Sequence, residues 1–79
     1  IDKVLAKDFR VYPNAVKEVI NIETSHTILS YKMFDVQGKM VLKNKFTDNK
    51  IHVKSLMKGM YFLTLKTEKG TVVKKIMKE

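Results

Sequence analysis

The segment that decides the fold is Leu56-Met-Lys-Gly-Met-Tyr-Phe-Leu-Thr-Leu65. Its first half has the spacing of a corner between strands, with the apolar Leu56, then Gly59, which can take a positive φ, and then Tyr61. A tyrosine at such a corner fills the core and hydrogen-bonds a nearby backbone carbonyl. Residues 60–65 continue as a nearly unbroken apolar run that favours a strand. We predict a central strand covered on both faces, with the rest of the chain packed around it.

Short segments with strand-like patterns recur on both sides of this strand and are separated by turn signals. No segment has a helical period. The pattern predicts seven strands, at residues 9–12, 16–23, 28–35, 39–43, 50–53, 60–67 and 71–77. Seven short antiparallel strands at this spacing predict an all-β fold, an immunoglobulin-like β-sandwich, for which we expect a Greek-key strand order.

Alternation along each strand predicts which side chains share a face. Ile20 and Ile22 are predicted to share one face of their strand, and Leu29, Tyr31 and Met33 one face of the next. Ile51 and Val53 are predicted to face inward. The last strand leaves two choices. Either Val72 and Ile76 face the core, or Val73 and Met77 do.

Turn residues mark the ends of the strands. In Asp35-Val36-Gln37-Gly38-Lys39 the carboxylate can hydrogen-bond its own turn, and Gly38 supplies the left-handed residue of a hairpin. A second glycine-terminated hairpin is predicted at Glu68-Lys69-Gly70. Pro13 and Asn14 end the first strand, because proline donates no hydrogen bond to a ladder and asparagine tolerates turn conformations.

The length of 79 residues predicts one domain. We read residues 1–8 as the tail of a linker, residues 9–79 as the folded domain, and the whole as part of a longer protein. There is no cysteine, which excludes disulfides, thiolate metal sites and thiol nucleophiles. No apolar run is long enough to span a membrane as a helix, and the start of the chain lacks the pattern of a signal peptide.

The net charge is +8, and fifteen of the sixteen basic residues are lysines. Specific recognition of phosphates and bases favours the forked guanidinium of arginine, so we expect no nucleic-acid partner. Lysines scattered over strands solubilise a protein and protect sheet edges from pairing. The alternative is a functional electropositive face.

Residue types that carry catalysis or bind metals do not form a motif. His26 and His52 have no nucleophile or set of carboxylates at a suitable spacing. Asp8, Asp35 and Asp48 lie in or near turns, where carboxylates cap backbone amides, and no glycine-spaced acidic or phosphate-binding loop is present. We therefore expect no enzyme activity, no cofactor and no metal site.

The C-terminal segment has an uneven charge, with five lysines against two glutamates in residues 66–79. A last strand at a sheet edge offers unpaired amides and carbonyls to a strand of another protein. We hypothesise a docking edge formed by Lys74, Lys75, Ile76, Met77, Lys78 and Glu79. The alternative is a lysine-guarded edge that binds nothing.

Four short motifs follow one another along the chain: Val11-Tyr12-Pro13-Asn14, Tyr31 to Lys39, Leu56-x-x-Gly59-x-Tyr61-Phe62, and Lys74-Lys75-Ile76. In this order the chain resembles, over residues 9–79, the type A C-terminal sorting domain of the type IX secretion system of Bacteroidota. The positions that we expect to determine the fold are Val11, Tyr12, Pro13, Asn14, Asp35, Gly38, Lys39, Leu56, Gly59, Tyr61 and Gly70. One departure is Ala15, where the family usually carries a second proline.

The resemblance implies a sorting signal. An upstream cargo domain reaches the periplasm by its own signal peptide, and this domain then directs it to the outer-membrane translocon and its shuttle proteins. The resemblance further implies that, as in many members of the family, a sortase-like peptidase removes the domain in the linker before Phe9 and attaches the cargo to anionic lipopolysaccharide. The implied location is the periplasm in transit, then the outer membrane, the cell surface or the medium.

Two other functions stay open at this point. One is a carbohydrate-binding or surface-binding β-sandwich appended to a secreted enzyme. The other is nonspecific binding of polyanions through the lysines, with an affinity that falls steeply with salt.

Overall fold

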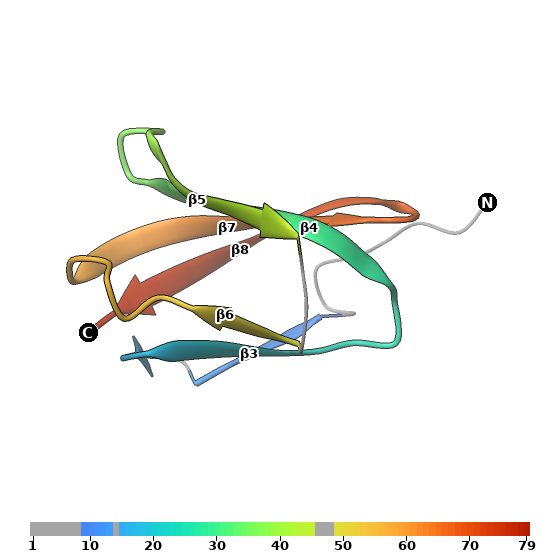
Figure 1. The fold of residues 1–79 in the computed structure, drawn as a ribbon, viewed down its shortest axis with the longest axis horizontal. Coiled ribbons are helices and arrows are strands. Elements are labelled where there is room, and N and C mark those ends of the chain that lie inside the picture. The colour runs from blue at the N-terminus through green and yellow to red at the C-terminus, as the bar shows by residue number, and fades with distance from the viewer. Residues whose placement is uncertain (1–8, 14, 46–48) are drawn as a thin grey trace.

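All regular structure in the described part of the chain is β-strand, so the all-β prediction is confirmed (Figure 1). The computed structural model describes residues 9–13, 15–45 and 49–79, which leaves the predicted linker, Asn14 and Asp48 outside the described residues. The strands are β1 (Arg10–Tyr12), β2 (Ala15–Val16), β3 (Val19–Glu23), β4 (Ile28–Asp35), β5 (Met40–Lys45), β6 (Lys50–His52), β7 (Gly59–Thr67) and β8 (Gly70–Lys78).

The strands form two sheets. The smaller sheet has the order β1-β3-β6, and the larger has the order β2-β8-β7-β4-β5. All neighbouring strands are antiparallel except β2 and β8, which run parallel. The prediction of seven antiparallel strands is therefore wrong in number and in the direction of one pair.

The extra strand arises because the predicted strand 16–23 is divided. Lys17 and Glu18 form an exposed bend, so β2 pairs with β8 in one sheet while β3 pairs with β1 and β6 in the other. Val16 and Ile20, on either side of the bend, are both fully buried. The bend thus lets one segment insert apolar side chains into the core from both sheets.

The two sheets enclose one hydrophobic core. In Figure 1, β3 and β6 of the smaller sheet lie across from β7 and β8 of the larger one. The largest fully buried side chains come from both sheets and from the residue before β1: Phe9, Ile20, Met33, Ile51, Leu63 and Leu65. Burying each such side chain contributes about 1.5 to 3 kcal/mol, which makes this core the main source of stability.

β7 is central in the larger sheet, as predicted, with β8 on one side and β4 on the other. The prediction that it is covered on both faces is wrong. Tyr61, Leu63 and Leu65 are buried, whereas Phe62 is 38% exposed and Lys66 is exposed. The apolar run therefore supplies a core face and a partly solvated face.

Most of the side chains predicted to share a face of their strand, or to face inward, are buried. Ile20, Ile22, Tyr31, Met33, Ile51 and Val53 are each at most 9% exposed. The prediction fails for Leu29, which is 48% exposed. The register of β4 against β7 shifts between Ile28 and Ser30, and Ile28 takes the buried position instead.

The ambiguous last strand is resolved. Val72 and Ile76 are 4% and 3% exposed, while Val73 and Met77 are 55% and 44% exposed. β8 therefore also has a core face and an exposed face.

The predicted hairpin between β4 and β5 is present. The side-chain Oδ1 of Asp35 accepts hydrogen bonds from the backbone amides of Gln37 and Lys39, both at 2.9 Å. The amide of Gly38 donates to the carbonyl oxygen of Asp35 at 3.0 Å, and Gly38 has a φ of 88°. Because this φ is unfavourable for residues with a Cβ atom, glycine suits the position. β5 then continues to Lys45, beyond the predicted end at residue 43.

The predicted corner before β7 is also present. The hydroxyl of Tyr61 donates a hydrogen bond of 2.6 Å to the backbone carbonyl of Met57, and Gly59 has a φ of 148°. Leu56 packs against the buried core. The tyrosine therefore fixes the loop before β7 to the strand whose core face the ring helps to fill.

Replacing Tyr61 with phenylalanine tests this corner. The ring is kept and the hydrogen bond to Met57 is lost, so we expect the free energy of unfolding to fall by about 1 kcal/mol, measured by urea denaturation. Tyr12→Phe is the control, because Tyr12 is 38% exposed and its change should stay within about 0.5 kcal/mol. Equal stabilities of the two variants would contradict the structural role of the hydroxyl.

Candidate recognition surface

The segment predicted to be a docking edge lies at the end of β8, but its last residues are not an open edge. β8 pairs with β7 on one side, and on the other side Met77 and Lys78 pair with β2. The amide of Glu79 also donates to the carbonyl of Val16 at 2.7 Å. The predicted open edge is therefore wrong for residues 77–79, because the unexpected strand β2 occupies it.

The side chains of residues 74–79 also do not form one cationic patch. In a strand, successive side chains point to opposite faces. Lys74 lies opposite the buried Leu63, and Lys78 is 8% exposed with its Nζ donating to the carbonyl of Glu79 at 2.9 Å. Lys75 and Met77 point away from the core. The lysine surplus is therefore divided between the two faces of β8.

Part of β8 does keep an open side. β2 pairs with β8 only at Met77 and Lys78, and no other strand in the described part of the chain lies beside β8 on that side. The stretch from Thr71 to Lys75 therefore has a partner strand on its β7 side alone. Backbone groups there that point away from β7 are available to a strand from another molecule.

The two histidines do not lie in a reactive cluster. The ring of His26 stacks on Phe9, with ring centroids 5.4 Å apart, and His52 is exposed on β6. Among the described residues, no three side chains of the types His, Asp and Glu are close enough to hold a metal ion. Every buried side-chain nitrogen or oxygen in these residues has a hydrogen-bond partner.

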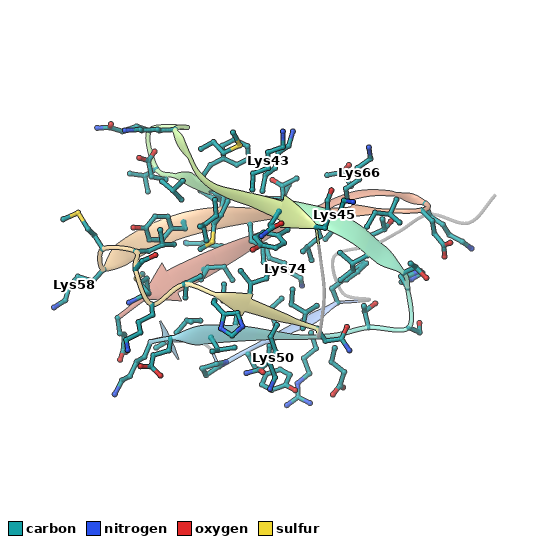
Figure 2. All side chains as sticks on the ribbon, viewed as in Figure 1. Lys43, Lys45, Lys50, Lys58, Lys66 and Lys74 are labelled. Atoms are coloured by element: carbon teal, nitrogen blue, oxygen red, sulfur yellow. The ribbon has the colours of Figure 1, made fainter. Side chains whose placement is uncertain are left out.

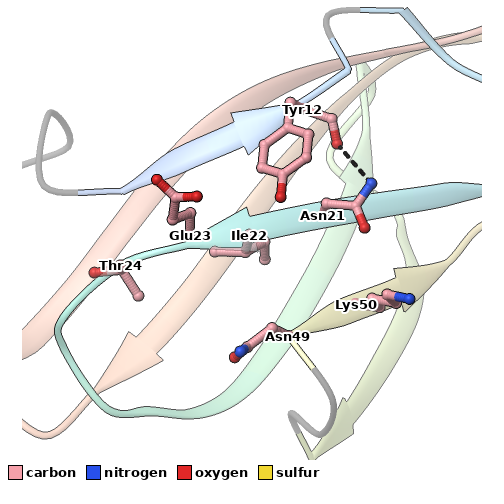
Figure 3. A pocket seen from close by; sticks show the side chains of 7 residues that line it. All are labelled: Tyr12, Asn21, Ile22, Glu23, Thr24, Asn49 and Lys50. Atoms are coloured by element: carbon pink, nitrogen blue, oxygen red, sulfur yellow. Dashed lines mark hydrogen bonds between the residues drawn. The ribbon is translucent and has the colours of Figure 1, made fainter.

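A hollow of about 340 Å³ lies on the smaller sheet, beside β1 and β3 (Figure 3). Its lining residues are Tyr12, Asn21, Ile22, Glu23, Thr24, Asn49 and Lys50. Asn21 Nδ2 donates to the carbonyl of Tyr12 at 3.4 Å, and Arg10 lies over the Tyr12 ring and 3.8 Å from Glu23. The amide, carboxylate and hydroxyl groups of this hollow can hydrogen-bond a polar ligand.

No helix that could cross a membrane occurs in residues 9–13, 15–45 and 49–79. Within these ranges, then, the molecule is a small β domain with a satisfied core and exposed sheet surfaces.

Comparison with known proteins identifies the family of the chain. Residues 10–79 match the family model described as the secretion system C-terminal sorting domain. The chain belongs to this family of type IX secretion sorting domains, and the resemblance noted from its motifs is confirmed. Beta-agarase D of Zobellia galactanivorans is 34% identical over 65 residues, which are 82% of this chain and 13% of the agarase. The chain thus spans only a small part of that relative.

Adjacent valines on β8 test which face is buried. Val72→Ala removes two buried methyl groups and should lower the free energy of unfolding by about 2 kcal/mol. Val73→Ala is the matched control, because its side chain is 55% exposed and its effect should stay within about 0.5 kcal/mol. Thermal and urea unfolding measure both variants. A larger loss for Val73→Ala would contradict the assignment of the faces.

Proposed function

We propose that this domain is a folded address that directs an attached cargo protein to the type IX translocon for passage across the outer membrane. The observation that carries the proposal is the match of nearly the whole chain to the sorting-domain family. The agarase supports it, because the similar region is a small part of a much longer protein. The domain acts through binding, with the cargo, the translocon and its shuttle proteins as partners, and it has no catalytic role.

The fold that we propose for this address is an immunoglobulin-like β-sandwich with Greek-key order. Two sheets around one core support it. We also propose that residues 1–8 form a linker from the cargo and that a sortase-like peptidase cuts there. Phe9 is 2% exposed, so a cut before it would leave the core intact. The released cargo would then be attached to the cell surface after transit through the periplasm.

We propose that residues 74–79 form the recognition segment and that its accessible parts make the contacts with the translocon. These parts are Lys75, Met77 and Glu79, together with the open side of β8 between Thr71 and Lys75. Lys74, Ile76 and Lys78 would hold the strand in place, since they share the core face of β8.

A reporter fusion tests the sorting function. A periplasmic reporter that ends in this 79-residue chain should reach the surface of a type IX-competent cell, and the reporter without the chain should stay in the periplasm. Surface protease accessibility measures delivery. The Lys17→Gln fusion, changed at the exposed bend between β2 and β3, is a control for handling and should be delivered normally. Equal delivery with and without the chain would contradict the proposal.

Point variants test the recognition segment. Deletion of residues 76–79 removes the buried Ile76 and pairing with β2, so lost export would not separate recognition from folding. The double variant Lys75→Glu, Met77→Ser changes exposed side chains, and we expect delivery to fall about tenfold, as for the loss of 1.4 kcal/mol of binding.

The matched control for this double variant is Lys58→Glu with Met57→Ser, which makes the same changes at exposed positions in the corner before β7. Normal melting temperatures of both purified variants establish that they fold. Equal delivery by the two would show that residues 74–79 are not read.

The hollow on the smaller sheet favours a second function, binding of a carbohydrate. An exposed tyrosine ring beside asparagine and glutamate side chains is suited to a hydroxyl-rich ligand. This function predicts that the chain binds glycans in solution and that its removal leaves export unchanged. The sorting function predicts the opposite export result.

A further inference from the structure

The larger sheet has an uncovered face, which we call the outer face: the side of β5, β4, β7 and β8 that points away from the core. Phe62, Met40, Val73 and Met77 on this side are 38 to 55% exposed. No strand in the described ranges packs against them. Apolar side chains that are open to water on three strands of one sheet face mark an interaction surface.

The register places Met40, Phe62 and Met77 at one end of the outer face, whereas Val73 lies opposite Thr64, nearer the other end. Phe34 lies opposite Met40 on β5 and opposite Phe62 on β7. Met60 on β7 lies opposite Met77 on β8. Cross-strand neighbours are close enough to touch, so the patch runs from β5 to β7 and reaches β8 through Met60 and Met77, with Lys75 opposite Phe62 at its border.

The other end of the outer face is basic. Lys32 lies directly opposite Lys43, and Ser30 lies between Lys45 on β5 and Lys66 on β7. These side chains are exposed, and Lys43 and Lys66 extend on the side of the sheet away from β3 and β6 (Figure 2). A hollow of about 320 Å³ is lined by Ser30, Lys32, Lys43 and Lys45, among others.

This basic end is not neutralised within the described residues. The acidic residues in these ranges are Glu18, Glu23, Asp35, Glu68 and Glu79. Only Glu79 follows the alternation of the outer face, and it lies beyond Met77, away from the lysines of the basic end. The ion pairs of Glu18 and Glu23 are with Lys54 and Arg10, off this face. Like charges directly opposite on neighbouring strands destabilise a sheet. The Lys32–Lys43 pair therefore favours an external anion.

We propose that the outer face binds the surface of an anionic lipid bilayer, with the lysines at the phosphate headgroups and the methionine and phenylalanine side chains at the boundary with the acyl chains. Lysines beside apolar residues are the pattern of interfacial membrane binding. A protein partner fits less well, because lysine is depleted in protein–protein interfaces. This inference goes beyond the sorting function and does not rest on it.

Vesicle co-sedimentation of the 79-residue chain tests the proposal. We expect binding to vesicles of phosphatidylcholine with added phosphatidylglycerol and little binding to phosphatidylcholine alone. The variant Lys43→Gln, Lys45→Gln, Lys66→Gln should bind the anionic vesicles on the order of 100-fold more weakly, since each lysine near such a surface contributes about fivefold.

The matched control is Lys17→Gln, Lys50→Gln, Lys58→Gln, which has the same net charge and changes exposed lysines off the outer face. Its affinity should fall by only a few fold. Equal losses for the two triple variants would overturn the proposal in favour of attraction by net charge. Equal binding to neutral vesicles would also overturn it. Melting curves establish that each variant folds.

A second variant separates a bilayer from a soluble polyanion. Met40→Ser with Met77→Ser removes exposed apolar side chains and no charge, and it should weaken vesicle binding several fold while leaving the weak binding of heparin unchanged. Tight heparin binding, with vesicle binding unaffected by the methionine changes, would assign the face to polyanions and overturn the proposal.

Discussion

One-sided burial of the larger sheet is the constraint on which the rest of the structure depends. With 79 residues, the chain forms two sheets around a single core, and each sheet has one face against that core. Tyr61, Leu63 and Leu65 on β7 fill the centre of this face. The opposite side of the same strands is left to solvent and is free to carry recognition.

The link between the sheets follows from the same constraint. The bend at Lys17 and Glu18 sends β2 to one sheet and β3 to the other, so that Val16 and Ile20 are both buried. By pairing with Met77 and Lys78, β2 also anchors the C-terminal strand. A terminal strand held in this way can present a fixed surface, which suits a domain that is recognised by its shape.

Local sequence signals predicted the local structure well. The spacing of Leu56, Gly59 and Tyr61 predicted the corner, and Asp35 with Gly38 predicted the hairpin, because both depend on residues close in the chain. The family was also identifiable from short motifs.

The errors concern contacts between distant segments. The parallel pairing of Val16 with Lys78 joins opposite ends of the chain, and strand patterns alone do not specify it. The exposed face of β7 was missed because an unbroken apolar run looks the same in the sequence whether its second face is buried or left to solvent. The division of the terminal lysines between the two faces of β8 was also missed. It follows from which side chains of β8 face the core, and the apolar pattern of this strand allowed both choices.

The five methionines report on this one-sided burial directly, because they lie on both faces of the larger sheet and in the corner before β7. Brief treatment with peroxide, followed by mass spectrometry of the sulfoxides, measures the accessibility of each sulfur. The structure predicts fast oxidation of Met40, Met57 and Met77 and strong protection of Met33, which is fully buried. Protection of Met40 and Met77 equal to that of Met33 in the isolated chain would contradict the account.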